Sequence, residues 1–148
     1  MTVSALAVSV VVLASCGSTT VGERETLDED RIIEALQDAG FNVPSGFEFG
    51  QAYQYAEFVG EPSRWARFDG PSELGDGRAV SMANPTYPAM TPAECDETKA
   101  GNWSSLGYVC TPGTIATQFP PRGAMDTVTA HLNHDQHRSH LFVHSSGH

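Results

Sequence analysis

Six histidines are the residues whose type and spacing most suggest chemistry, and all of them lie within residues 131–148 of the 148-residue chain. Neutral imidazole nitrogens bind zinc, copper and nickel, and three or four that converge could form a metal site. The segment has no cysteine and no His-Glu-x-x-His pattern, and Asp135 is its only acid. The histidines therefore suggest metal binding without specifying a metal.

A C-terminal β-hairpin is the element expected to position these histidines. Residues 127–132 and 140–144 alternate between apolar and polar side chains, which is typical of strands with one buried face. The segment between them, His134–His137, is expected to form a four-residue loop at the turn of the hairpin.

Two registers of this hairpin satisfy the sequence pattern. The four-residue loop predicts that His131 pairs with His140 and that Ala130 pairs with Leu141. A register shifted by two residues would pair Leu132 with Leu141. Both keep the apolar side chains on one face, which is the condition that a buried face imposes.

The metal-site hypothesis and its alternatives depend on the opposite face of this hairpin. That face and the loop would supply a zinc or copper ligand set of His131, His140, His144, His134 and His137. Directly opposed residues on a ribbon lie about 5 Å apart at Cβ, so two of them could share a metal. The simplest alternative is a solvated strand face and turn, and another is a surface that gains charge between about pH 5 and 7.

The N-terminal residues indicate export and lipidation. Ala5–Leu13 is an apolar run that is too short for a hydrocarbon core, which takes about 20 residues, but it suits a signal peptide. The next residues complete Leu13-Ala14-Ser15-Cys16, which resembles the lipobox of bacterial lipoproteins over the first 17 residues only. This resemblance implies cleavage before Cys16 and attachment of fatty acids such as palmitate, and two acyl chains give a stable membrane anchor.

The chain is expected to comprise three parts. Residues 1–15 form the signal peptide, and residues 16–26 form the lipidated cysteine and a flexible polar tether. Residues 27–148 form one small extracytoplasmic domain.

Once Cys16 carries lipid, Cys95 and Cys110 remain as a pair in an oxidising compartment, where a disulfide is favoured. A redox couple would normally have the much closer Cys-x-x-Cys spacing. We therefore expect a structural disulfide that closes a loop of about 15 residues.

The remaining patterns favour an α+β fold, with one N-terminal helix packed on a small antiparallel sheet. The helix is expected over residues 28–39, with a capping box at Thr26-x-x-Glu29 and an end at Gly40. Residues 84–103 are expected to form a loop in which Thr91–Glu94 makes one helical turn. Besides the hairpin, strands are expected at Phe47–Tyr55, Ser63–Phe68, Arg78–Met82, Ser105–Thr111 and Thr114–Phe119.

Charge and motifs limit the functional classes. The formal net charge of −10 disfavours nucleic acid as a partner, because such a surface is repelled by phosphates. A serine hydrolase is the third hypothesis, but the chain has no Gly-x-Ser-x-Gly turn. We expect a non-enzymatic, lipid-anchored module that needs no cofactor and binds an envelope protein or a small ligand. The alternative is a metal-binding lipoprotein that uses zinc or copper.

Overall fold

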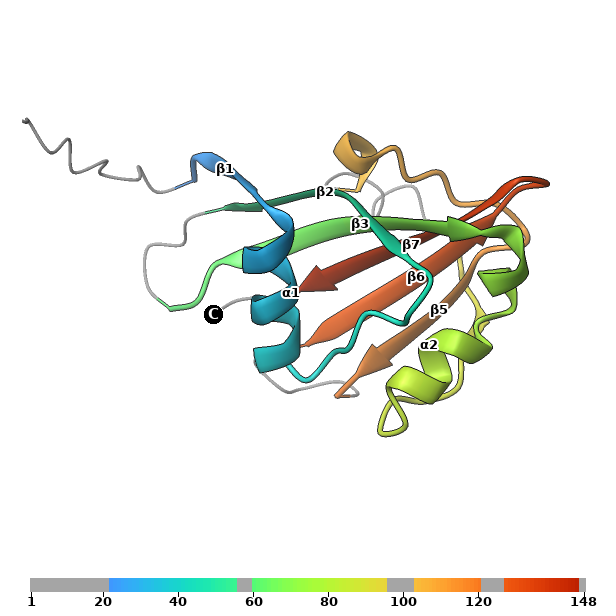
Figure 1. Ribbon diagram of the computed structural model, residues 1–148. Helices are drawn as coiled ribbons and strands as arrows, with labels where there is room; N and C mark the ends of the chain where they lie inside the picture. Colours follow the sequence, from blue (N-terminus) through green and yellow to red (C-terminus); the bar gives the residue numbers. More distant parts are fainter. Residues whose placement is uncertain (1–21, 56–59, 96–102, 121–126, 147–148) are drawn as a thin grey trace, which may run out of the picture.

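The computed structural model describes residues 22–55, 60–95, 103–120 and 127–146. Seven strands form one open antiparallel sheet in the order β1-β2-β3-β7-β6-β5-β4 (Figure 1). The strands are β1 (Arg24–Leu27), β2 (Glu48–Tyr55), β3 (Ser63–Pro71), β4 (Thr91–Pro92), β5 (Ile115–Phe119), β6 (Val128–His134) and β7 (Arg138–Ser145). The helical elements are α1 (Glu29–Asp38) and α2 (Arg78–Ala83), with 3-10 turns η1 (Ser72–Asp76) and η3 (Ser104–Leu106).

The fold is mainly β, so the expected α+β class is wrong. Within the described residues α1 is the only helix longer than two turns, whereas the sheet has seven strands. Two short strands, β1 and β4, extend the sheet at its edges and carry no alternating pattern that would have predicted them. Residues 24–26, which were expected to be tether, belong to β1, and the helical turn expected at Thr91–Glu94 is replaced by β4.

Two segments that were expected to be strands are helical instead. Arg78–Met82 lies in α2, and Ser105–Thr111 begins in η3 and continues without strand pairing. Both segments pack against the sheet, since Val80 and Leu106 are buried in its two cores. Apolar spacing in such short segments does not separate a strand from a buried helical turn.

The predicted helix is confirmed as α1, with one change at its start. Asp28 rather than Thr26 caps the helix, because its side chain accepts a hydrogen bond from the Arg31 backbone N–H at 2.9 Å. Gly40 ends the helix with a φ of 82°, a left-handed conformation that suits glycine. The Phe41 N–H then reaches back to the carbonyl of Leu36, as in a Schellman motif.

Side chains cover both faces of the sheet. On one face α1 and α2 close a core that includes Ile32, Leu36 and Val80 (Figure 1). On the other face the segment 103–110 covers a second, largely aromatic cluster. The structure therefore has two cores separated by one layer of strands, whereas the sequence pattern had suggested a metal site or a solvated face on the second side.

The predicted disulfide between Cys95 and Cys110 is confirmed. Its two Cα atoms lie 5.5 Å apart, and it closes a loop with a sequence separation of 15 residues. Cys110 packs at the margin of the aromatic cluster. The disulfide therefore ties the covering segment to the chain that follows β4.

The C-terminal hairpin is confirmed, but its register is the shifted alternative. Leu132 pairs with Leu141, and His131 pairs with Phe142 rather than His140. The turn has four residues, as expected, but lies one residue further along the chain, at residues 135–138, because His134 pairs with Ser139. Among the described residues, no helix is long and apolar enough to cross a membrane.

Candidate functional site

His144 is half enclosed in the aromatic face of the sheet. Its ring stacks on Trp65, the cross-strand neighbour, with ring centroids 4.4 Å apart. Trp65 in turn stacks on Tyr53 of β2, so three rings form a row across three strands. The buried Nε2 atom of His144 has no hydrogen-bond partner. Burial, with a smaller contribution from the charge of His131, lowers the pKa of His144 to about 4, so the ring is neutral at pH 7.

His131, on the neighbouring strand β6, also contacts the segment 103–110 that covers the aromatic cluster. Its Nδ1 atom lies 3.1 Å from the hydroxyl oxygen of Tyr108, whose pKa is raised by burial. Trp103 meets both His131 and His144 edge-on, with ring centroids 5.1 and 5.8 Å away. These two histidines are therefore packing residues beneath the covering segment.

His140 belongs to a separate network near the turn of the hairpin. Its Nδ1 atom lies 2.5 Å from Oδ1 of Asp69, and Arg67 donates to the same oxygen at 2.8 Å. Burial alone would raise the pKa of Asp69, but the hydrogen bonds from Arg67 and His140 outweigh burial and lower it. His140 Nε2 lies 3.7 Å from Oδ2 of Asp135. The imidazole is thus held between two carboxylates, an arrangement that fixes its orientation.

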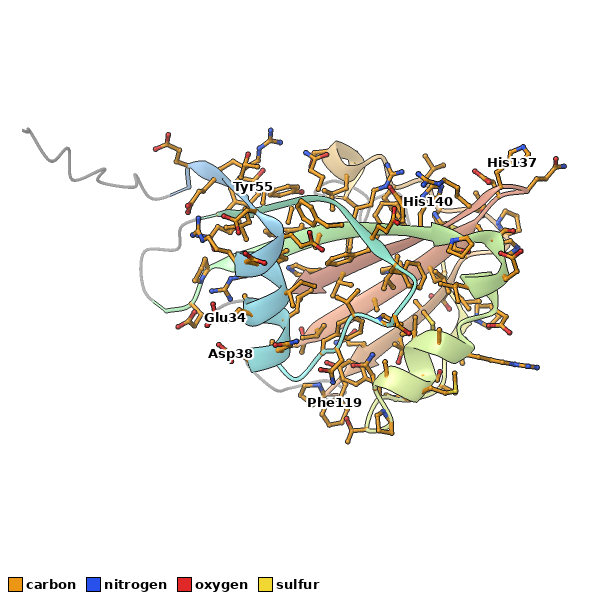
Figure 2. All side chains as sticks on the ribbon, in the orientation of Figure 1. Glu34, Asp38, Tyr55, Phe119, His137 and His140 are labelled. Carbon is orange, nitrogen blue, oxygen red and sulfur yellow. A yellow bond between two sulfur atoms is a disulfide. The ribbon has the colours of Figure 1, made fainter. Side chains whose placement is uncertain are left out.

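The remaining two histidines, His134 and His137, are exposed, and Figure 2 shows His137 at the tip of the hairpin. The five predicted ligands therefore lie in three neighbourhoods. Within the described ranges, no group of three or more His, Cys, Asp or Glu side chains could hold a metal ion. The lipidation site expected at Cys16 lies outside the described residues.

A pocket of about 510 Å³ lies on the opposite face of the sheet, beside α1. Its helical wall is one stripe of α1 formed by Arg31, Glu34, Ala35 and Asp38. These residues are spaced three and four apart, so they share one side of the helix, and the methyl group of Ala35 leaves room between the charged side chains. In Figure 2, Glu34 and Asp38 project from the same side of α1.

The sheet supplies the floor of this pocket from three adjacent strands. Gln54 of β2 pairs with Arg64 of β3, which pairs with Ser145 of β7, and all three line the pocket. Successive residues of a strand point to opposite faces, so Ser145 faces the pocket while His144 faces the aromatic cluster. None of the five predicted histidine ligands lines the pocket.

Both arginines of the pocket are already paired with carboxylates. Arg31 donates to Glu25 at 2.6 Å, and Arg64 donates to Glu61 at 3.1 Å. The hydrogen bond from Arg31, followed by one from Gln54, lowers the pKa of Glu25, so this carboxylate stays charged beside the guanidinium.

Three other lining residues have no such partner. The side chains of Glu34, Asp38 and Ser145 make no hydrogen bond or ion pair within the part of the chain that the structure describes. Glu34 and Asp38 are exposed, whereas Ser145 is only 5% exposed. The pocket therefore combines two unneutralised carboxylates with the hydroxyl of a mostly buried serine, which is free to bond a ligand.

No protein-family model matches this chain, and no curated protein or solved structure matches it either. The function must therefore be inferred from the chemistry of the chain's own residues.

Sequence reasoning missed this pocket. The sequence signal was weak: two acids one turn apart, each followed by an alanine, in Glu34-Ala35 and Asp38-Ala39. Both alanines line the pocket, although their methyl groups suggest no polar chemistry. The contribution of Arg64 and Ser145 depends on the order of the strands, which periodicity does not reveal.

Proposed function

We propose that the chain is a lipid-anchored extracytoplasmic module that binds a small polar ligand without chemical conversion. The observation that carries this proposal is the pocket beside α1. Its volume of about 510 Å³ falls within the roughly 300–1,000 Å³ typical of small-molecule sites. Its lining holds polar groups without a partner, which a ligand could satisfy.

The arrangement of the acid–base groups supports binding without chemical conversion. A hydrolase of the kind considered above would place a histidine next to a serine at the rim of the pocket. Ser145 and Ser146 line the pocket, but the histidine that precedes them, His144, belongs to the opposite face of the sheet. The ordered pair of His140 and Asp69 also lies on that opposite face, away from the ligand.

The extracytoplasmic location rests on the lipobox and is consistent with the disulfide. A lipid on Cys16 would hold the domain at the membrane and raise its effective concentration there. Labelling of cells with radioactive palmitate should mark the chain, and the Cys16→Ser variant should remain unlabelled. An unlabelled parent chain would refute the anchor and leave the pocket unaffected.

Ligand binding is tested by filling the pocket. The full chain in non-ionic detergent is screened by thermal shift against small cations, anions, zwitterions and neutral sugars. At least one class should raise the melting temperature of the parent but not that of Ala35→Trp, whose indole would occupy the pocket. Gln37→Trp is the matched control, because Gln37 is exposed on the same helix and lies outside the pocket. If no class separates Ala35→Trp from the parent, the proposed function is wrong.

A further inference from the structure

The charges of the pocket favour a cationic ligand. Once the two arginine pairs have formed, Glu34 and Asp38 remain as negative charges without a partner within the described residues. They stand four residues apart on one side of α1, which places their Cβ atoms about 5–6 Å from each other. A ligand with two positive groups at a similar separation could neutralise both.

Ser145 is an independent indication of a ligand at this position. Its side chain is 5% exposed, yet its hydroxyl has no hydrogen-bond partner among the described residues. Its hydroxyl oxygen is accessible from the pocket, because the fully buried side-chain atoms without a partner in the described residues are those of Tyr87 and His144. It lines the pocket from β7, opposite the carboxylates on α1, and can accept a hydrogen bond from an N–H group placed between them.

From these observations we infer that the pocket binds a small organic diamine in its doubly protonated form. The inference rests on the proposed function and names its ligand class. One ammonium group pairs with Glu34 and the other with Asp38, while Ser145 accepts a hydrogen bond from an ammonium N–H. Such charge-assisted hydrogen bonds are stronger than neutral ones, and the pocket wall shields them partly from solvent.

A divalent metal ion fits the same residues less well. Calcium takes six to eight oxygen ligands, and the described part of the chain brings together no group of three or more His, Cys, Asp or Glu that could hold an ion. Two carboxylates one helical turn apart are better suited to two separate cations on a short chain. A metal is therefore an alternative that the test must exclude.

The test is calorimetric titration of 1,4-diaminobutane into the full chain in non-ionic detergent at low salt. We expect binding of one molecule per chain that weakens as salt rises to about 0.15 M, because exposed carboxylates are screened. The singly charged 1-aminobutane should bind at least about tenfold more weakly, since it leaves one carboxylate unpaired. Calcium chloride should not displace the diamine.

Variants separate a specific site from general attraction to an acidic protein. Glu34→Gln/Asp38→Asn should abolish binding, whereas Glu29→Gln/Asp30→Asn, which removes the same charge from α1 outside the pocket, should bind like the parent. Ser145→Ala should weaken binding severalfold with the stoichiometry unchanged. An equal loss in both charge variants, or displacement by calcium, would overturn the inference.

The screen with Ala35→Trp keeps this inference distinct from the proposed function. An anion or a sugar could raise the melting temperature of the parent but not that of Ala35→Trp, while 1,4-diaminobutane does not bind. In that case the pocket is a binding site and the diamine inference is wrong. If nothing passes the screen and the diamine does not bind either, both fail.

Discussion

The two faces of the sheet show two ways of placing polar groups among packed side chains. On the aromatic face, rings from β2, β3 and β7 stack on one another, and the segment 103–110 covers them. On the face beside α1, two arginines are paired with acids, but two further acids and a buried serine have no partner within the described residues. On the aromatic face the unpartnered Nε2 atom of His144 is enclosed by packing, whereas the unpartnered groups on the other face line a pocket and are accessible to a ligand.

The largest effect that would test this comparison is expected from Trp65→Ala. Trp65 is 6% exposed and stacks on both Tyr53 and His144, so its removal would open a cavity at the centre of the aromatic face. We expect a loss of about 3–5 kcal/mol in the free energy of unfolding, measured by urea denaturation with far-ultraviolet circular dichroism. Trp65→Phe, which keeps a ring, should lose less. A change below about 1 kcal/mol in Trp65→Ala would show that the face is not a true core.

The second effect concerns the cover of the same face. Removing the disulfide with Cys95→Ser/Cys110→Ser should lower stability by about 3 kcal/mol, because a closed loop of 15 residues no longer restricts the unfolded chain. Urea denaturation with and without a reducing agent measures this. Reductant should destabilise the parent by a similar amount and leave the double variant unchanged. A variant as stable as the parent would mean that packing alone holds the segment on the sheet.

The third effect is a pH dependence that arises from His144. Its pKa is about 4 in the folded state and near 6.5 when unfolded, so the unfolded chain takes up the proton first as the pH falls. The contribution of the neutral His144 ring to the free energy of unfolding is therefore complete above about pH 6.5. It is lost progressively as the pH falls towards 4, by up to roughly 3 kcal/mol. His144→Phe keeps a stacked ring and should remove this part of the pH dependence. The pKa of Asp69 is lowered in the folded state, so its contribution to stability is lost only as the pH falls below the usual value of 3.8, which is outside this window.

Elements with a local sequence pattern could be predicted, whereas the long-range contacts that cover the second face could not. The helix α1, the strands β2, β3, β5, β6 and β7, and the disulfide could be located, because each has a strong local pattern or a unique pairing. The covered second face could not be derived in the same way. Phe142 between His140 and His144 indicated a face that is not purely solvated, but the return of residues 103–110 over it is a long-range contact.

The register error had a different cause. Both pairings of the hairpin kept its apolar residues on one face, so periodicity could not choose between them. The choice depends on the turn: Asp135 accepts hydrogen bonds from the backbone N–H groups of His137 and Arg138 and fixes the four-residue turn between His134 and Ser139. This local chemistry moved His131 opposite Phe142 and away from His140, and the expected three-histidine cluster did not form.

The smallest change in the free energy of unfolding is expected for the acids that line the pocket, and the sign of this change is the informative result. Glu34 and Asp38 are like charges four residues apart on α1, and Asp38 lies at the helix C-terminus, where the macrodipole disfavours a negative charge. Glu34→Gln/Asp38→Asn should therefore leave stability unchanged or raise it by about 0.2–0.5 kcal/mol. Glu29→Gln/Asp30→Asn should lower stability, because these acids lie at the N-terminus of the helix, where negative charge is favourable. Urea denaturation of the two variants in parallel measures the difference. A clear loss of stability in Glu34→Gln/Asp38→Asn would assign these acids to the fold, whereas an unchanged or raised stability would show that the fold does not need their charge.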